Sequence, residues 1–180
     1  MKIAVILGSG RDGRKGEAVV NWILEKAQAR GGAVTYELVD IKDYELPFYT
    51  NELPPSFLEK QYGDAAIQCC SDTIDQYAGF VFVTPEYNHS VPAQFKNAFD
   101  HLYSEWKEKP VLVAGYSWGG GKFCIPAWRE VVGAPQMRWV ERPMSFFIGE
   151  EWVEGQFVPA AAQEEKLHAA LSEVETLLGA

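Results

Sequence analysis

Ile3-Ala4-Val5-Ile6-Leu7 is an apolar run without a polar residue, and Gly8-Ser9-Gly10-Arg11-Asp12-Gly13-Arg14-Lys15-Gly16 follows it directly. An unbroken apolar run of this kind is typical of a strand that is buried on both faces of a parallel sheet. Behind the glycines, residues 17–30 carry apolar side chains at helical spacing, and Gly31-Gly32 ends that helix. The first thirty residues therefore predict a strand, a glycine-rich loop and a helix.

The rest of the chain continues this alternation. We predict further strands at residues 34–39, 80–83 and 111–114 and within 138–148, and we place the strand at 34–39 at an edge of the sheet. Helices are predicted at 56–77, from Pro92 onward, at 123–132 and up to Leu178. Crossovers between such strands are right-handed. The 180 residues therefore predict one domain, residues 1–180, with an α/β fold of three layers around a five-stranded parallel sheet.

Charge and composition exclude several classes of protein. The chain carries 25 acidic and 16 basic residues, a net charge of −9, so we expect no nucleic-acid partner. Its apolar runs are shorter than the roughly 18 residues of a membrane span, and residues 3–7 are too few for a signal peptide. We expect a cytosolic protein without a membrane partner. Cys69, Cys70 and Cys124 lack metal-ligand spacing and are expected to be buried, reduced thiols, with no metal site.

The loop at residues 8–16 combines three features of a phosphate site. Its glycines leave backbone N–H groups free, a helix N-terminus follows it, and Arg11, Arg14 and Lys15 supply positive charge. Ser9 adds a hydroxyl, and a guanidinium holds two phosphate oxygens at once. The sequence therefore predicts an anion site between the first strand and the first helix.

The type of nucleotide stays open at this point. The loop lacks the Gly-Lys-Ser/Thr ending of a Walker A motif, but Gly8 to Gly13 fits the dinucleotide pattern G-x-G-x-x-G. Asp40 follows the second predicted strand, where a Rossmann fold places its ribose-binding acid. A mononucleotide and a dinucleotide are both compatible with this loop.

Two more loops follow predicted strands and should reach the same edge of the sheet. In residues 84–92, prolines enclose Glu86, Tyr87 and Asn88, a stiff backbone beside an aromatic ring that suits the edge of a flat heterocycle. Ser90 is predicted to cap the following helix, and His89, which lacks an evident acid partner, is given no proton-transfer role. Residues 117–122, Ser-Trp-Gly-Gly-Gly-Lys, allow close backbone approach to a ligand, and their tryptophan is placed to cover a planar ring.

These loops resemble a known family. Val83-Thr84-Pro85-Glu86-Tyr87-Asn88-His89-Ser90-Val91-Pro92, followed by Lys96-Asn97-Ala98-Phe99-Asp100, is similar to the T-P-E-Y-N-x-S-x-P…K-N-A-x-D signature of the NAD(P)H-dependent FMN reductases. That flavodoxin-like group includes chromate and quinone reductases. Gly8-Ser9-Gly10-Arg11 resembles its G-S-x-R phosphate loop, and Ser117 with Gly119 to Gly121 resembles its later glycine-rich loop. The resemblance extends to about Val132.

The resemblance implies a flavodoxin-like sheet of order 2-1-3-4-5 and noncovalently bound FMN. Many members carry Ser and Asn at the positions of Arg14 and Gly16, so the contacts in that half of the phosphate loop must differ in this chain. Carried over residue by residue, the phosphate site comprises Ser9, Arg11, Arg14, Lys15 and Gly16, one side of the isoalloxazine site comprises Pro85, Glu86, Tyr87 and Asn88, and its other edge comprises Ser117, Trp118 and Gly119.

The resemblance also implies an activity. Hydride passes from NADPH or NADH to FMN and then, by a ping-pong mechanism, to a small acceptor such as a quinone, a flavin, an azo dye or chromate. The chemistry belongs to the flavin, so no catalytic acid or base is predicted. The alternatives are an electron-carrying flavodoxin, whose T/S-x-T-G-x-T loop is absent here, an NAD-binding dehydrogenase without flavin, and a non-catalytic flavin sensor.

An oligomeric state is implied as well. Members of the family commonly form homodimers or dimer-based homotetramers, so we expect a homo-oligomer. Tyr103 and Trp106, aromatic residues at the end of a predicted helix, are predicted to anchor the interface.

Overall fold

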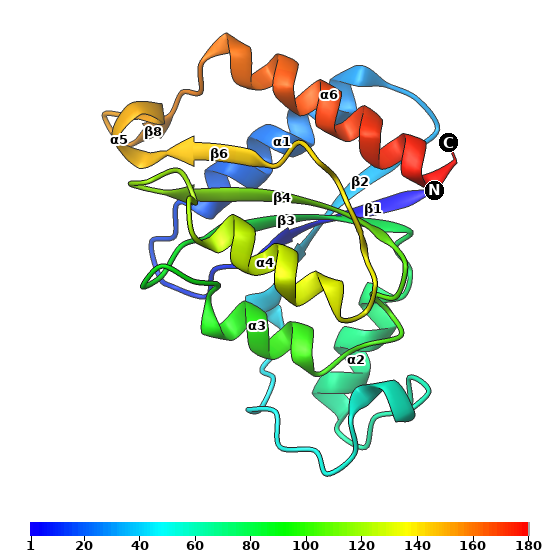
Figure 1. Ribbon diagram of the computed structural model, residues 1–180. Coiled ribbons are helices and arrows are strands. Elements are labelled where there is room, and N and C mark those ends of the chain that lie inside the picture. Colours follow the sequence, from blue (N-terminus) through cyan, green and yellow to red (C-terminus); the bar gives the residue numbers. More distant parts are fainter. Residues whose placement is uncertain (180) are drawn as a thin grey trace.

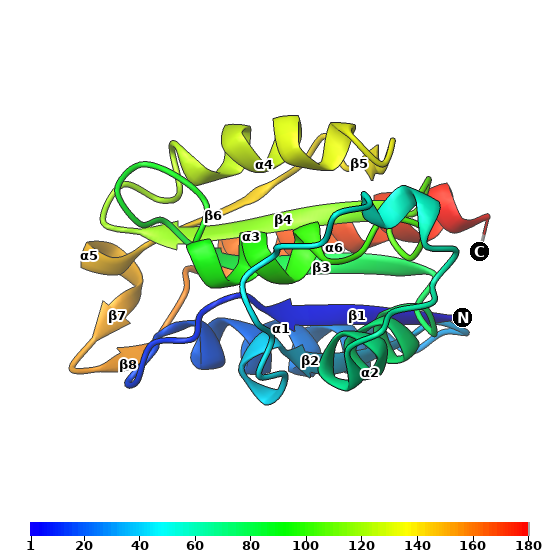
Figure 2. The same cartoon turned by 90° about the horizontal axis from the view of Figure 1, so that it is seen from below.

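Strand β1 (Lys2–Leu7) lies inside the sheet, between the edge strand β2 (Thr35–Asp40) and β3 (Gly79–Pro85). Next to β3 comes β4 (Pro110–Ser117), and all of these pairs are parallel. The computed structural model describes residues 1–179. It confirms the predicted sheet order 2-1-3-4-5 and the edge position of the second strand, and Figure 2 shows the strands side by side in that order.

Helices cover both faces of the sheet, because alternate residues of each strand point to opposite sides. Ile3, Val5 and Leu7 pack into one core with residues of α1 (Gly16–Arg30) and α6 (Ala161–Leu178). Ala4 and Ile6 belong to the opposite core, with α2 (Ala65–Ile74), α3 (Ala93–Asp100) and α4 (Cys124–Gly133). Figure 1 shows the resulting three layers, so the predicted flavodoxin-like sandwich is confirmed.

The fifth strand differs from the prediction of one strand within residues 138–148. It is divided into β5 (Arg138–Trp139), which pairs with the start of β4, and β6 (Met144–Phe147), which pairs with its end. From Trp139 to Met144 the chain advances five residues, whereas their partners Val111 and Ala114 are three residues apart. The two additional residues and Pro143, which has no N–H for a ladder, interrupt the strand.

The predicted helix at 56–77 is too long at its N-terminal end. A short 3₁₀ helix, η2, occupies Pro55–Phe57, and Glu59 and Lys60 then take positive φ values of 47° and 62°, which a helix does not allow. Helix α2 begins only after Asp64, whose carboxylate accepts hydrogen bonds from the backbone N–H groups of Ala66 and Ile67.

A short insertion that the sequence did not predict lies between β6 and α6. It consists of α5 (Ile148–Glu151) and the hairpin of β7 (Trp152–Val153) and β8 (Gln156–Phe157). Its aromatic rings pack on α1 and β6, since Phe157 contacts Trp22 and Phe146 edge-on at 5.9 and 5.4 Å between ring centroids. Figures 1 and 2 place this insertion at the end of the sheet where β4 and β6 terminate.

Two expectations about single residues are wrong. Trp106 is 2% exposed, stacks on Phe99 with 5.1 Å between ring centroids, and donates its indole N–H to the Phe99 carbonyl, so it is a core residue and no interface anchor. Tyr103 is half-buried, and its hydroxyl donates a hydrogen bond to the Ala134 carbonyl.

Cys70 and Cys124 are buried free thiols as expected, but Cys69 is exposed.

Residues 1–179 contain neither a membrane-spanning helix nor a cluster of metal-ligating side chains. No helix in this range is long and apolar enough to cross a membrane. No cluster of three or more His, Cys, Asp or Glu side chains in the same range is arranged to hold a metal ion.

Candidate functional site

The loops that follow β1, β3 and β4 meet at one edge of the sheet. Parallel register aligns the ends of the three strands, with Leu7 opposite Val83 and Val83 opposite Ala114, and the Gly8 N–H continues the ladder to the Val83 carbonyl at 2.9 Å. A cavity of about 280 Å³ lies between these loops. Ligands of open parallel sheets bind at this edge, outside the carboxyl ends of the strands.

The cavity brings together most of the predicted site residues. Of the twelve, Gly16, Asn88 and Gly119 do not line it, and three residues that were not predicted do: Gly13, Tyr116 and Ile148. The predicted residues that line it are Ser9, Arg11, Arg14, Lys15, Pro85, Glu86, Tyr87, Ser117 and Trp118.

The first loop presents unused donors to this cavity. Helix α1 starts after Lys15, whose side chain does not cap it, so the N–H groups of its first turn are left to other partners. The fully buried Ser9 hydroxyl lies 2.8 Å from the Tyr87 hydroxyl. Arg11 and Lys15 are exposed cations that lie over the rings of Tyr87 and Trp152, at 5.6 and 5.4 Å. This end of the cavity is suited to an anion.

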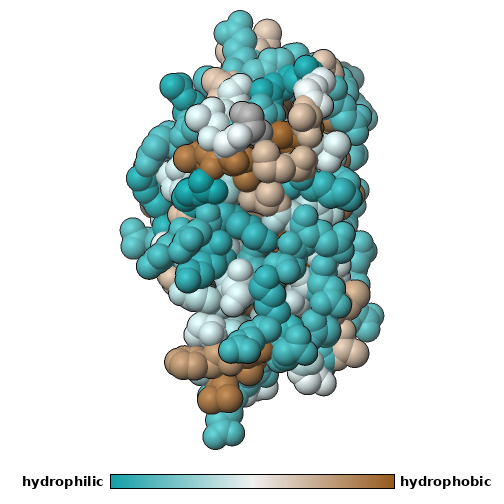
Figure 3. Space-filling model, turned by 90° about the vertical axis from the view of Figure 1, so that its right-hand side faces the viewer, coloured by the Kyte–Doolittle hydropathy of each residue, from teal (hydrophilic) through white to brown (hydrophobic). Residues whose placement is uncertain are grey.

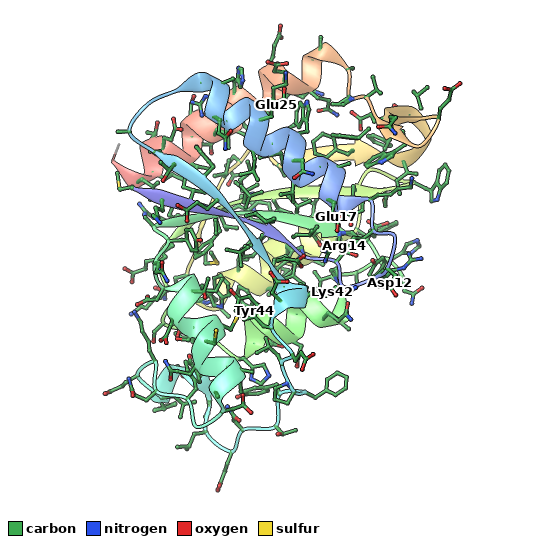
Figure 4. All side chains as sticks on the ribbon, turned by 180° about the vertical axis from the view of Figure 1, so that it is seen from behind. Asp12, Arg14, Glu17, Glu25, Lys42 and Tyr44 are labelled. Atoms are coloured by element: carbon green, nitrogen blue, oxygen red, sulfur yellow. The ribbon has the colours of Figure 1, made fainter. Side chains whose placement is uncertain are left out.

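Arg14 is held differently from the other two cations. Its guanidinium makes a two-pronged contact with the Asp40 carboxylate, donates to the Ser9 carbonyl at 2.7 Å, and donates through Nε to Glu17 at 3.0 Å. Burial lowers the pKa of Arg14, but the hydrogen bonds with Asp40 and Glu17 raise this pKa by more, so the net shift is upward. Figure 4 shows Arg14 and Glu17 at the junction of the loop with α1, beside Asp12 and Lys42, which form an outer ion pair at 2.7 Å.

The Arg14–Asp40 pair decides two questions that the sequence left open. The side chains are only 10% and 12% exposed, and one oxygen of Asp40 also accepts the N–H of Lys42. Asp40 therefore holds the first loop against the end of β2, and its carboxylate is already paired rather than free for a ribose. The guanidinium of Arg14 is likewise directed at protein oxygens, although its side chain lines the cavity.

The second loop is a tight hairpin. Tyr87 and Ser90 exchange backbone hydrogen bonds of 3.2 and 3.0 Å around Asn88 and His89, whose φ values of 49° and 60° are those of a two-residue turn with both central residues left-handed. Ser90 is thereby part of the hairpin, and α3 has no side-chain cap, so the predicted Ser90 cap is wrong. His89 stacks on Phe123 with 4.1 Å between ring centroids.

Glu86 joins the second loop to the third. Its Oε2 atom accepts the backbone N–H groups of Phe123 and Cys124, at 2.6 and 3.1 Å, and so caps α4. The Glu86 carboxylate is therefore turned toward the helix, although the residue also lines the cavity. Sequence inspection alone did not suggest this cap, because the two partners are 37 and 38 residues apart.

The third loop is ordered by Ser117. The Ser117 hydroxyl oxygen accepts the N–H groups of Gly119 and Gly121, at 3.0 and 2.9 Å. Gly121, at a φ of 76°, lies so close to Gly115 that a Cβ would be 2.9 Å from its Cα, so no side chain fits there. Trp118 is 78% exposed, and its ring lies against Gly149 of the α5 insertion. The indole is thus supported from one side and open on the other.

Comparisons with known proteins fit this geometry. Residues 1–152 match the family model described as NADPH-dependent FMN reductase. An NAD(P)H-dependent FMN reductase of Schizosaccharomyces pombe is 37% identical over 137 residues, which cover 76% of this chain and 68% of that protein. A quinone reductase of Escherichia coli is 30% identical over 138 residues, covering 73% and 69%. The fold is similar to that of a flavoenzyme NAD(P)H:acceptor oxidoreductase of Paracoccus denitrificans, with a TM-score of 0.76, 21% identity, and 98% and 96% of the two chains covered.

The buried ion pair gives a stability prediction. Replacing Arg14 by Met leaves the Asp40 carboxylate largely buried without its counter-charge, so we expect the free energy of unfolding to fall by about 3–5 kcal/mol. The double variant Arg14→Met/Asp40→Asn removes the charge and should recover most of the loss. Urea unfolding measures both. If the single variant is as stable as the parent protein, the pair does not hold the loop to the sheet.

Proposed function

The chain belongs to the NADPH-dependent FMN reductase family, and from this premise we propose how its residues serve that activity. It is an oxidoreductase that uses FMN and NAD(P)H. We propose that the cavity between the three loops is the FMN site and that the electron acceptor is a quinone or a similar flat molecule. The observation that carries this proposal is one cavity that is lined both by cations of the first loop, beside the start of α1, and by aromatic side chains of the second and third loops.

The basic end of the cavity fits a phosphate. Ser9 and the first turn of α1 supply neutral donors, and Arg11 and Lys15 supply charge from exposed positions. Arg14 contributes by holding the Ser9 carbonyl, which keeps the loop in the conformation that presents these donors. A chain with a net charge of −9 needs such a local concentration of donors to bind a dianion.

The other end fits a flat ring. Pro85 and Tyr87 line the cavity together with Trp118, whose indole is 78% exposed. Asn88 and Gly119 adjoin these lining residues in sequence without lining the cavity themselves. The hairpin at 87–90, the Glu86 cap and the Ser117 hydroxyl fix the two ring-side loops relative to each other. A preformed ring site lowers the ordering entropy that binding costs.

Bound FMN supplies the chemistry, since it accepts a hydride from NAD(P)H and passes the electrons to the second substrate. The residues of this chain bind and orient, and we assign none of them the role of acid or base. Nicotinamide and a quinone are both flat rings, and each must approach the reacting atom to about 3–3.5 Å. We propose that both use the same surface, beside Trp118, so that the oxidised nicotinamide leaves before the acceptor enters.

We further propose that the protein is a homodimer and that the segment between β2 and α2 forms the interface. Phe48 is 83% exposed, and the backbone on either side of it is held by Asn97. The Asn97 amide donates to the Pro47 carbonyl at 2.8 Å and accepts the Tyr49 N–H at 3.0 Å. His101 adds a third bond, to Pro47. The same segment exposes Leu53 and Phe57. Figure 3 shows hydrophobic atoms gathered at the lower end of the molecule, where Figure 1 places this segment.

We also propose a cytosolic location.

The flavodoxin and dehydrogenase alternatives are less well supported than an FMN reductase. An electron carrier does not consume NAD(P)H, and the acid that a dinucleotide ribose would need is paired with Arg14.

Arg11 gives the first test of the FMN site. Arg11→Ala should weaken FMN binding about tenfold to a hundredfold, because one charge-assisted contact is lost, and should leave apoprotein melting unchanged, because the side chain is exposed. Lys42→Ala is the matched control, since it removes a neighbouring cation that does not line the cavity. The measurement is a fluorescence titration of the apoprotein with FMN. Equal affinities for the parent and the Arg11 variant would remove Arg11 from the site.

Steady-state kinetics test the shared surface. Initial rates against NAD(P)H at several quinone concentrations should give parallel double-reciprocal lines. Trp118→Ala, measured on protein saturated with FMN, should raise KM for the quinone several-fold, because the exposed indole offers its open face to the acceptor. Intersecting lines, together with a ternary complex seen by an independent binding method, would require two separate substrate sites and would contradict the proposal.

Light scattering tests the dimer. Phe48→Glu places a charge in the proposed interface and should convert a dimer into a monomer that keeps the far-ultraviolet circular dichroism spectrum of the parent protein. Val153→Glu, at an exposed apolar position of the β7–β8 hairpin, is the control and should leave the mass unchanged. A monomeric parent protein, or a Phe48 variant that stays dimeric, would show that this segment is not the interface.

A further inference from the structure

Position 16 has no room for a side chain, and Tyr116 is the reason. A Cβ on Gly16 would lie 2.7 Å from the Tyr116 hydroxyl oxygen and 2.7 Å from the nearest methyl of Leu7. The space beside the first turn of α1 is filled instead by a hydroxyl from the end of β4.

The Tyr116 hydroxyl is directed at the anion end of the cavity. Tyr116 is 4% exposed, yet it lines the cavity together with Ser9 and Lys15. The hydroxyl lies next to that of Ser9 and to the backbone of Gly16, and Ser9 is in turn bonded to the hydroxyl of Tyr87. Three hydroxyl groups, from the loop after β1, the loop after β3 and the end of β4, therefore converge beside the N-terminus of α1.

This hydroxyl stays a donor at neutral pH. Burial raises the pKa of Tyr116 above its usual value, and the contacts with Ser9 and Gly16 offset this only in part. Arg14, whose charge acts on Tyr116, is committed to Asp40 and to the Ser9 carbonyl. A phosphate that enters this end therefore meets neutral O–H and N–H donors at its centre, with Arg11 and Lys15 as exposed cations.

We propose that the Tyr116 hydroxyl, which occupies the space beside Gly16, donates a hydrogen bond to the phosphate of FMN. The proposal rests on the proposed FMN site and adds a residue of β4 to it. The residue does not belong to the three sequence motifs, because it precedes the Ser117 loop and its partner Gly16 is a hundred positions earlier.

The test compares FMN with riboflavin, which has the same ring and ribityl chain but no phosphate. Tyr116→Phe keeps the buried ring and removes only the hydroxyl. We expect FMN affinity of the apoprotein to fall about tenfold or more, as for a hydrogen bond to a charged group, while riboflavin affinity stays unchanged. Tyr36→Phe, which removes a buried hydroxyl bonded to Glu175 outside the cavity, is the control and should change neither affinity.

A second variant covers the chance that Tyr116→Phe disturbs the fold, which apoprotein melting will reveal. Gly16→Ala places a methyl group against the Tyr116 hydroxyl and should also weaken FMN more than riboflavin. In the double variant the two losses should not add, since both act on one contact. Equal weakening of both ligands, or unchanged FMN affinity, would overturn the role of Tyr116. A parent protein that binds no FMN would instead contradict the proposed function itself.

Discussion

The parallel register of β1, β3 and β4 is the constraint on which the site depends. Because Leu7, Val83 and Ala114 lie opposite one another, the three loops that follow these strands start at the same level and enclose one cavity. The register is fixed in turn by burial on both faces, since a slip by one residue would turn Ile3, Val5 and Leu7 from one core into the other. The burial of the strands on both faces therefore determines both the fold and the position of the three loops.

Besides the hydrogen bonds within each loop, contacts between the loops and neighbouring elements hold the site together. Arg14 and Asp40 join the first loop to the end of β2, Ser9 and Tyr87 join it to the second loop, and Glu86 joins the second loop to α4. Each of these contacts uses a polar group that a motif-based interpretation would reserve for the ligand. In this chain the ligand-facing surface consists of the remaining donors, which the loops hold in place before any ligand arrives.

The sequence was informative where a pattern is local and repeated. The apolar runs of β1, β3 and β4 and the glycines behind β1 predicted a parallel sheet with a ligand site at its carboxyl edge, and the family resemblance implied the strand order. The sequence was misleading where contacts with segments far away in the chain determine the role of a residue. Trp106 looks exposed until its ring is seen on Phe99, and the Arg14 guanidinium looks free until the end of β2 brings Asp40 against it. Tyr116 carried no signal, because its significance comes from the missing side chain of Gly16.

Amide hydrogen exchange with and without FMN tests the central claim most directly, because it reports on all three loops in one experiment. The account predicts that FMN slows exchange at residues 11–18, 85–88 and 116–121 together, and leaves the segment 48–57 unchanged. A second cavity, of about 230 Å³, is lined by residues of the segments 41–46 and 94–98 and by Gly10. Protection confined to that cavity, or to only one of the three loops, would contradict a single FMN site at the carboxyl edge of the sheet.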